Sequence, residues 1–325
     1  MYWHDRKYLQ GSLKQRGPFL LFKKQRNMKL TIIGLGLIGG SMAKDLKKSN
    51  FATEIVGVDA NPAHQKEALK LGLVDRIEEF NDALKQTDLV IIAIPVDKIL
   101  TVLPHVLDLI DANTTVTDVG STKKVICNAV KDHPKRGNFV PSHPMSGTEN
   151  FGPRAAIENL FEGKISIICD HQQSKPQHLA LVEKMYQALG MDIAYMTSDE
   201  QDHTTAYVSH LPHVTSFALA NTVLNKQKRK IIFDLASGGF QSTVRLAKSS
   251  PEMWVPIFRQ NKEYVIESLA AYIKNLEEMK SAIEDESSDK LLKLVQDATK
   301  IREVLDKKNP YLIKRERKIV KLYTR

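Results

Sequence analysis

The feature that most constrains the fold is a short apolar run that ends in a glycine-rich turn. Residues 29–34 read as a buried strand, and a helical pattern at 38–49 follows at once. The intervening G-x-G-x-x-G spacing allows a tight turn, a close backbone approach to a pyrophosphate, and close packing of helix against strand. The N–H groups that open the helix can bind the phosphates. The predicted dinucleotide contacts are Gly34, Leu35, Gly36, Leu37, Ile38 and Gly39.

An acidic residue after the next strand supports this interpretation. The strand at 54–59 ends in Asp59, 23 residues after Gly36, where a carboxylate can accept hydrogen bonds from ribose hydroxyls. Its charge would repel a 2′-phosphate, so the pattern favours NAD over NADP as the cofactor. Ile94 and Pro95, which end a third buried strand at 88–95, are expected to line the same site. The alternative interpretation is a structural glycine turn beside a surface aspartate.

Strands and helices alternate over the first half of the chain. Further strands are expected at 115–119, 138–141, 164–169 and 191–195, and further helices at 62–71 and 99–110. This alternation predicts an α/β fold, a doubly wound Rossmann-type sheet over residues 28–198 that binds ligands at the carboxyl ends of its strands.

The alternation stops at about residue 198, and an all-helical domain is expected over 199–306. The Ser198-x-x-Gln201 pattern indicates a capping box at the start of a long helix, which Pro212 should kink. Apolar residues at heptad-like spacing within 266–283 and 291–305 predict an antiparallel helix pair. We favour a homodimer interface over an internal helical core for this pair, because so small a helical domain exposes much apolar surface.

The net charge of +9 is concentrated at the two ends of the chain. Residues 1–27 carry +6 and residues 307–325 carry +7, which leaves −4 for the body between them. A mildly acidic body with two basic tails is not expected to bind nucleic acid. The first hypothesis for the N-terminal extension is that Met28 is the natural start. The alternative is a tail that binds a membrane surface or directs the chain to an organelle.

Cysteine content and hydropathy exclude several other classes of protein. Cys127 and Cys169 have no metal-ligand or disulfide spacing, which suits a reducing cytoplasm. No set of Asp, Glu or His residues has the spacing of a metal site. No apolar run approaches the roughly 18 residues of a membrane span.

Two polar clusters follow neighbouring strands of the predicted sheet. The first, 118–123, contains Ser121, and the second, 142–149, contains His143, Thr148 and Glu149. We expect both to face the nicotinamide half of the cofactor site. His143, predicted to lie in a loop before a proline, could accept a proton from a substrate hydroxyl as a neutral imidazole. Ser121 could form a hydrogen bond with this histidine or with the substrate hydroxyl. The alternative is a turn histidine that bonds to backbone.

Two more clusters lie in the helical half. Helical spacing places Asp202, Ser209 and His213 on one stripe that could line the cleft between the domains, with His210 about 80° away from Asp202. Either histidine could instead fill a core or interface position. In the segment 236–245, a glycine turn that includes Gly239 could let Arg245 grip a ligand carboxylate with two hydrogen bonds. A structural salt bridge is the alternative for Arg245.

Taken in order, the motifs GLGLIGGS, DVGSTK, HPMSGTE, SHLPH and GGF…TxR over residues 28–305 resemble those of the prephenate/arogenate dehydrogenases of tyrosine biosynthesis. The resemblance implies NAD-dependent oxidative decarboxylation of prephenate to 4-hydroxyphenylpyruvate. It also implies roles for the matching residues: His143 as general base on the ring 4-hydroxyl, Ser121 beside it, and Arg245 on a substrate carboxylate. His213, with Asp202, Ser209 and Glu149, would shape the substrate pocket and its gate, and Thr148 and Gly239 complete the substrate-binding set. The helical domain would form the dimer, with Trp254 approaching the partner's site.

The family commonly has Arg-Asp after GGF, where this chain has Gln241-Ser242, which leaves substrate preference and tyrosine feedback open. Neither a chorismate mutase domain nor a regulatory domain is expected from the segments that flank the motifs. Three other functions compete with prephenate oxidation. Arogenate dehydrogenase differs only in its substrate, a β-hydroxyacid dehydrogenase would use a lysine on the long helix, and a non-catalytic NAD-binding sensor would need neither a proton acceptor nor a carboxylate-binding arginine.

Overall fold

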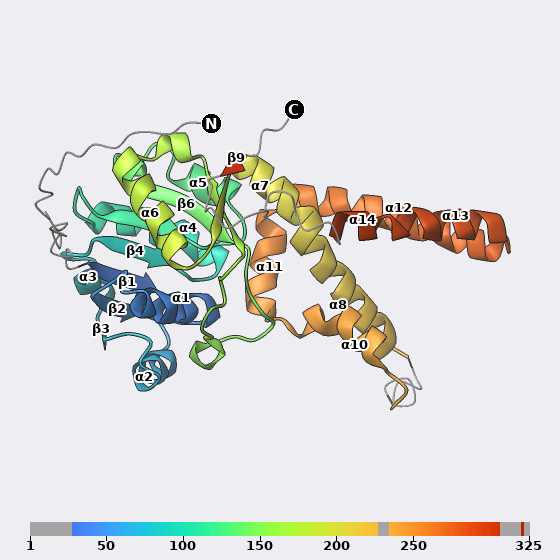
Figure 1. Ribbon diagram of the computed structural model, residues 1–325, viewed down its shortest axis with the longest axis horizontal. Coiled ribbons are helices and arrows are strands. Elements are labelled where there is room, and N and C mark those ends of the chain that lie inside the picture. Colours follow the sequence, from blue (N-terminus) through green and yellow to red (C-terminus); the bar gives the residue numbers. More distant parts are fainter. Residues whose placement is uncertain (1–27, 227–233, 306–319, 322–325) are drawn as a thin grey trace, which may run out of the picture.

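The computed structural model describes residues 28–226, 234–305 and 320–321. The basic extension 1–27 and most of the basic tail at 307–325 lie outside the described residues, so the hypotheses about them are not addressed by the fold. The described chain forms a twisted sheet covered by helices, followed by a helical domain that extends away from it (Figure 1).

The sheet contains the strands β1 (Lys29–Ile33), β2 (Glu54–Val58), β3 (Arg76–Ile77), β4 (Leu89–Ile92), β5 (Thr115–Asp118), β6 (Phe139–Pro144), β7 (Ile165–Cys169), β8 (Asp192–Met196) and β9 (Val320–Lys321). Their spatial order is β3-β2-β1-β4-β5-β6-β7-β8-β9, and all neighbours are parallel except the antiparallel pair β6–β7. The predicted doubly wound sheet is confirmed. The two-residue strand β3 was not predicted, and it adds an edge beside β2.

Helices cover both faces of the sheet, as the chain alternates between strand and helix. They are α1 (Leu37–Lys48), α2 (Pro62–Lys70), α3 (Phe80–Ala83), α4 (Val96–Leu109), α5 (Lys124–Ala129) and α6 (Pro176–Ala188). Successive residues of β1 point to opposite faces. Leu30 and Ile32 join a core with α1 and α6, whereas Ile33 joins a second core with α4.

The helical domain contains α7 (Ser198–Thr205), a π-helical turn (Ala206–His210), α8 (Leu211–Leu224), α10 (Gly238–Val244), a 3₁₀ turn (Arg245–Lys248) and α11 (Pro251–Gln260). It ends with α12 (Lys262–Glu284), α13 (Ser288–Thr299) and α14 (Ile301–Leu305). Trp254 and Ile257 of α11 belong to the same core as α4, so α11 attaches this domain to the sheet. The antiparallel pair α12 and α13 projects from the body as an arm (Figure 1), which confirms the predicted helix pair.

Four local expectations were wrong. The strand β6 extends to Pro144, so His143 lies in a strand and not in a loop, because Ser142, His143 and Pro144 pair with β7. The capping box uses Thr197 and Glu200, one residue earlier than expected. The predicted long helix is interrupted by the π-turn directly before Pro212, which falls in the first turn of α8. The glycines before Arg245 open the helix α10 and do not form a turn.

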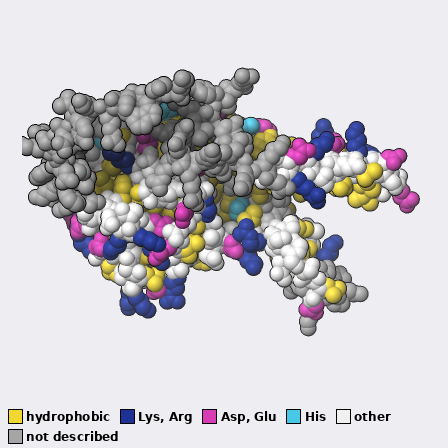
Figure 2. All heavy atoms as spheres, in the orientation of Figure 1, with side chains coloured by type: hydrophobic (Ala, Val, Ile, Leu, Met, Phe, Trp, Pro, Cys, Tyr) yellow, Lys and Arg dark blue, Asp and Glu magenta, His cyan; other side chains and the backbone are white. Residues whose placement is uncertain are grey.

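The arm carries a large exposed apolar surface. Its exposed apolar side chains include Ile266, Tyr272, Ile273, Leu276, Met279, Ile283, Leu292 and Val295. Figure 2 shows hydrophobic side chains gathered near its tip. A monomeric soluble protein rarely leaves so much apolar surface uncovered. In the part of the chain that the structure describes, no helix is both long and apolar enough to cross a bilayer.

Candidate active site

The glycine loop between β1 and α1 has the geometry of a phosphate-binding turn. Gly34 has φ +98°, and a Cβ there would lie 2.3 Å from the carbonyl oxygen of Ala93, so only glycine fits. A Cβ on Gly39 would lie 2.0 Å from the carbonyl oxygen of Gly34. Gly36 is the N-cap of α1, and apart from its own neighbours in the chain no atom lies within 4 Å of where its Cβ would be. This space, at the positive end of a 12-residue helix, can accommodate an anionic group.

Asp59 lies beside this loop, directly after β2. One carboxylate oxygen accepts a hydrogen bond from the Leu35 N–H at 2.9 Å, and the other accepts one from the Asn61 N–H at 2.9 Å. The carboxylate therefore holds the glycine loop in place and retains lone pairs for a further donor. Ile94 packs against Gly34 from the end of β4, and Pro95 is the N-cap of α4. The structure thus brings the sequence-predicted dinucleotide contacts together at the carboxyl edge of the sheet.

His143 and Ser121 meet at the same edge through a residue that sequence reasoning missed. His143 points from β6 and is only 9% exposed. The side-chain nitrogen of Gln201, on α7, lies 3.1 Å from His143 Nδ1 and donates to the carbonyl oxygen of Ser121 at 3.0 Å. Ser121 therefore joins this group through its backbone carbonyl. Of its two expected partners, His143 is reached only through Gln201, and the substrate hydroxyl stays a prediction. No hydrogen bond to His143 Nε2 is present among the described residues.

The electrostatic surroundings keep His143 neutral. Burial, together with the smaller effect of the nearby positive charge of Lys123, lowers its pKa to about 3. Lys123 is itself fully buried and forms an ion pair with Asp118 at the end of β5. Asp118 also accepts hydrogen bonds from the Gly120 and Ser142 N–H groups. At neutral pH the imidazole is uncharged.

The Asp202 side chain binds the backbone at the start of α5. It does not lie on the expected stripe with Ser209 and His213. Its two carboxylate oxygens accept the N–H groups of Lys123 and Lys124 at 2.7 and 2.9 Å, at the start of α5. Burial raises the pKa of Asp202 to about 6. The π-turn explains the error, because it shifts the helical phase between Asp202 and His213.

The two histidines of the helical domain differ in access. His210 is fully buried, and its Nδ1 accepts a hydrogen bond from the Asn261 side chain at 3.0 Å. His213 is half-buried, and its Nδ1 lies 2.9 Å from the carbonyl oxygen of Ser209. The His213 ring stacks on Trp254 of the same chain with centroids 3.5 Å apart. His213 is therefore the histidine that a ligand can reach.

Arg245 lies in an ion pair that joins the two domains. Its Nη1 donates to a carboxylate oxygen of Glu149 at 2.7 Å, and its side chain remains 52% exposed. The charge of Arg245 helps to lower the pKa of His213, after the larger effect of burial, so the two groups are neighbours. Thr148 lies in the same loop as Glu149, where its hydroxyl accepts the Asn150 N–H. Gly239 lies in α10, where its carbonyl oxygen accepts from Ser242 and Thr243.

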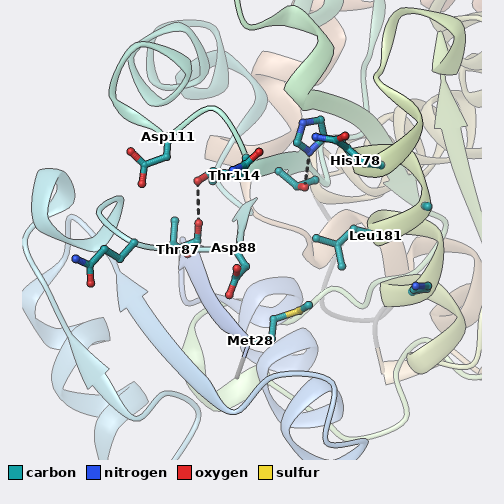
Figure 3. Close-up of a pocket in the computed structure, with 13 residues that line it drawn as sticks. Met28, Thr87, Asp88, Asp111, Thr114, His178 and Leu181 are labelled. Carbon is teal, nitrogen blue, oxygen red and sulfur yellow. Dashed lines mark hydrogen bonds between the residues drawn. The ribbon is translucent and has the colours of Figure 1, made fainter. Parts of the chain in front are cut away.

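A cavity of about 590 Å³ lies at the opposite edge of the sheet (Figure 3). It is lined by residues that include Met28, Asp88, Thr114, His178 and Leu181, near the amino ends of β1, β4 and β5. None of the sequence-predicted site residues lines it. The candidate active site is therefore the carboxyl edge, where the glycine loop, His143 and the start of the helical domain converge.

Comparisons with known proteins match both halves of the chain. The family described as "Prephenate dehydrogenase, nucleotide-binding domain" matches residues 42–195, and "Prephenate dehydrogenase, dimerization domain" matches residues 197–297. Prephenate dehydrogenase of Bacillus subtilis is 33% identical over 86% of this chain and 76% of its own length. Cyclohexadienyl dehydrogenase of Zymomonas mobilis is 30% identical over 84% of this chain and 94% of its own length.

Solved structures agree with the sequence matches. Prephenate dehydrogenase of Aquifex aeolicus, in complex with hydroxyphenyl propionate and NAD+, superimposes with a TM-score of 0.80. It is 31% identical, and the match covers 87% of this chain and 100% of the other. Arogenate dehydrogenase of Synechocystis gives a TM-score of 0.70 at 28% identity, covering 86% of this chain and 100% of the other.

Proposed function

The chain belongs to the prephenate dehydrogenase family, and we propose that it catalyses the NAD-dependent oxidative decarboxylation of prephenate to 4-hydroxyphenylpyruvate in tyrosine biosynthesis. The observation that carries the proposal is the position of His143. It is a buried, neutral imidazole at the carboxyl edge of a nucleotide-binding sheet, with no hydrogen bond to Nε2 among the described residues.

The glycine loop and Asp59 fit NAD as the cofactor. The space at Gly36 and the uncapped start of α1 suit a pyrophosphate, and the remaining lone pairs of Asp59 suit ribose hydroxyls. A 2′-phosphate would lie against the negative charge of Asp59, which disfavours NADP. When bound, NAD supplies the acceptor for the hydride from C4 of the substrate ring.

His143 accepts the proton of the ring 4-hydroxyl while the hydride leaves C4. Removal of this proton stabilises the positive charge that develops at the carbon. Loss of the ring carboxylate as CO₂ then makes the ring aromatic, and the proton returns to the phenol oxygen. The low pKa of the free imidazole keeps its base form fully populated at neutral pH. Ser121, the second residue of the proposed catalytic pair, is joined to His143 through the side-chain amide of Gln201.

Arg245, with Glu149, Thr148, Ser209, His213 and Gly239, forms the proposed substrate-binding group. The Arg245 guanidinium pairs with Glu149 across the domain boundary. A substrate carboxylate can replace Glu149 in a two-point hydrogen-bonded contact, which gives this ion pair the role of a gate. The aromatic faces of His213 and Trp254 form one wall beside it.

We further propose that the chain works as a homodimer in the cytoplasm. The matched dimerization domain contains α12 and most of α13, whose apolar side chains are exposed in the single chain. A second copy of the arm would cover them.

Arogenate is the second candidate substrate, because cyclohexadienyl and arogenate dehydrogenases are among the similar proteins. Initial rates with prephenate and with arogenate, each with NAD and with NADP, test the proposal. Turnover of prephenate with NAD at the highest kcat/KM is the expected result. If only arogenate were turned over, the proposed reaction type would stand and the proposed substrate would be wrong. NAD binding without any turnover would contradict the enzymatic proposal and favour a sensor.

A further inference from the structure

The side chain of Gln201 is fully buried between two groups of the candidate site. Its Nε2 lies 3.0 Å from the Ser121 carbonyl oxygen and 3.1 Å from His143 Nδ1. A carbonyl oxygen can only accept a hydrogen bond, so the nitrogen end of the amide must face Ser121. One hydrogen of the NH₂ group then points to Ser121 and the other points to His143.

This arrangement decides where the imidazole carries its hydrogen. The amide nitrogen of Gln201 can only donate, so Nδ1 of His143 must accept with its lone pair. A neutral imidazole with a lone pair on Nδ1 carries its hydrogen on Nε2. Thr205 Oγ1 is a third and longer acceptor for the same amide nitrogen, at 3.3 Å, and its own hydroxyl hydrogen goes to the Gln201 backbone carbonyl at 2.9 Å. The atom that faces Nδ1 is still a nitrogen that can only donate, so the assignment holds.

We propose that Gln201 is the positioning residue that fixes the tautomer of His143, with the hydrogen on Nε2 in the free enzyme. The inference rests on the proposed function, because it concerns the residue assigned there as the proton acceptor. An Nε2 that already carries a hydrogen can donate to a hydroxyl oxygen but cannot take its proton. Catalysis therefore requires a tautomer change before the proton is transferred.

The structure offers a way to make that change. The Oε1 atom of Gln201 is buried and has no hydrogen-bond partner among the described residues. A half-turn of the amide brings Oε1 to His143, where it accepts from Nδ1–H. One proton passes from Nε2 to solvent water and one passes from solvent water to Nδ1, so the proton balance closes and the charge of the imidazole does not change. The half-turn breaks the hydrogen bond from Gln201 to the Ser121 carbonyl. The free enzyme therefore prefers the orientation in which Nε2 of Gln201 faces Ser121 and His143.

The test is the ¹⁵N spectrum of the His143 imidazole in the full-length, substrate-free protein, because nitrogen shifts distinguish the two tautomers. We expect an unprotonated Nδ1 and a protonated Nε2 throughout the neutral range. In Gln201→Glu, the carboxylate accepts from Nδ1–H, so the hydrogen should move to Nδ1. In Gln201→Met, which has no donor, the two tautomers should exchange.

Asn261→Leu is the matched control, because Asn261 makes the same contact with His210. It should shift the His210 signals and leave those of His143 unchanged.

A wild-type spectrum with the hydrogen on Nδ1 would overturn the proposal, and so would a Gln201→Met spectrum identical to the wild type. The wild-type spectrum decides even if the variants do not fold. The spectrum requires no turnover, so absence of prephenate oxidation would refute the proposed function without refuting the tautomer assignment.

Discussion

The lowered pKa of His143 makes the free energy of unfolding depend on pH. Burial holds its pKa at about 3 in the folded chain, against 6.5 for an ordinary histidine. The unfolded chain therefore takes up a proton below about pH 6.5 that the folded chain refuses. A lowered pKa of this kind stabilises the fold above pH 6.5, and the stabilisation is lost as the pH falls toward 3.

The change His143→Asn removes this titration. Between pH 7 and pH 5 the wild type should lose about 2 kcal/mol more free energy of unfolding than the variant. Urea unfolding of both proteins at the two pH values measures the difference. Comparing the two proteins cancels the opposite contribution of Asp202, whose pKa is raised in the fold. Equal losses would mean that His143 is accessible to protons.

Arg245 is expected to act in substrate binding. The change Arg245→Ala should raise KM for prephenate about 10-fold or more with a smaller effect on kcat, because a charge-assisted contact to a carboxylate is lost. Arg154→Ala is the control, since it removes an exposed ion pair with Glu67 outside the site. Steady-state kinetics would disprove the assignment if the two variants had the same KM.

Local sequence could not reveal Gln201. Its contacts with Ser121 and His143 span 80 and 58 residues. Glutamine at the start of a helix instead suggests a capping role, which Thr197 and Glu200 fill here. The contacts of Asp202 with the start of α5 are equally non-local.

Among the elements, the glycine loop was the most predictable because its constraint is local backbone geometry. The change Gly34→Ala should abolish measurable NAD binding, since the added Cβ would collide with the Ala93 carbonyl. Gly72→Ala is the control, because Gly72 has positive φ but open space around it, so it should cost only about 1–2 kcal/mol of stability. Calorimetric titration with NAD compares them. Normal NAD binding by Gly34→Ala would contradict the loop assignment.

The elements that were wrongly predicted depend on tertiary partners. The strand β6 continues through His143 because β7 pairs with it in the antiparallel sense, which prolines at 141 and 144 conceal in the sequence. The π-turn in the helical domain rotates the residues after it relative to those before it, and a uniform helical period does not predict this rotation. Periodicity thus predicted which segments are helices and which are strands. It did not predict which side of the helix each of residues 202–213 occupies.

The exposed apolar side chains of the arm support the proposed homodimer. The double change Ile273→Lys with Leu276→Lys should convert the dimer to monomers, because two exposed apolar side chains of α12 become charged. Asn275→Lys adds charge on the same helix without removing apolar surface and should remain dimeric. Light scattering gives the mass of each protein. A wild type that is monomeric at micromolar concentration would refute the dimer proposal.

The most direct test of the account is NADH formation from NAD and prephenate by the wild type and by His143→Asn, at matched NAD occupancy. We predict one NADH for each CO₂ released by the wild type, and a decrease of about 10²- to 10⁴-fold in kcat for the variant with unchanged Kd for NAD. A variant that retained nearly full activity would show that His143 is not the proton acceptor.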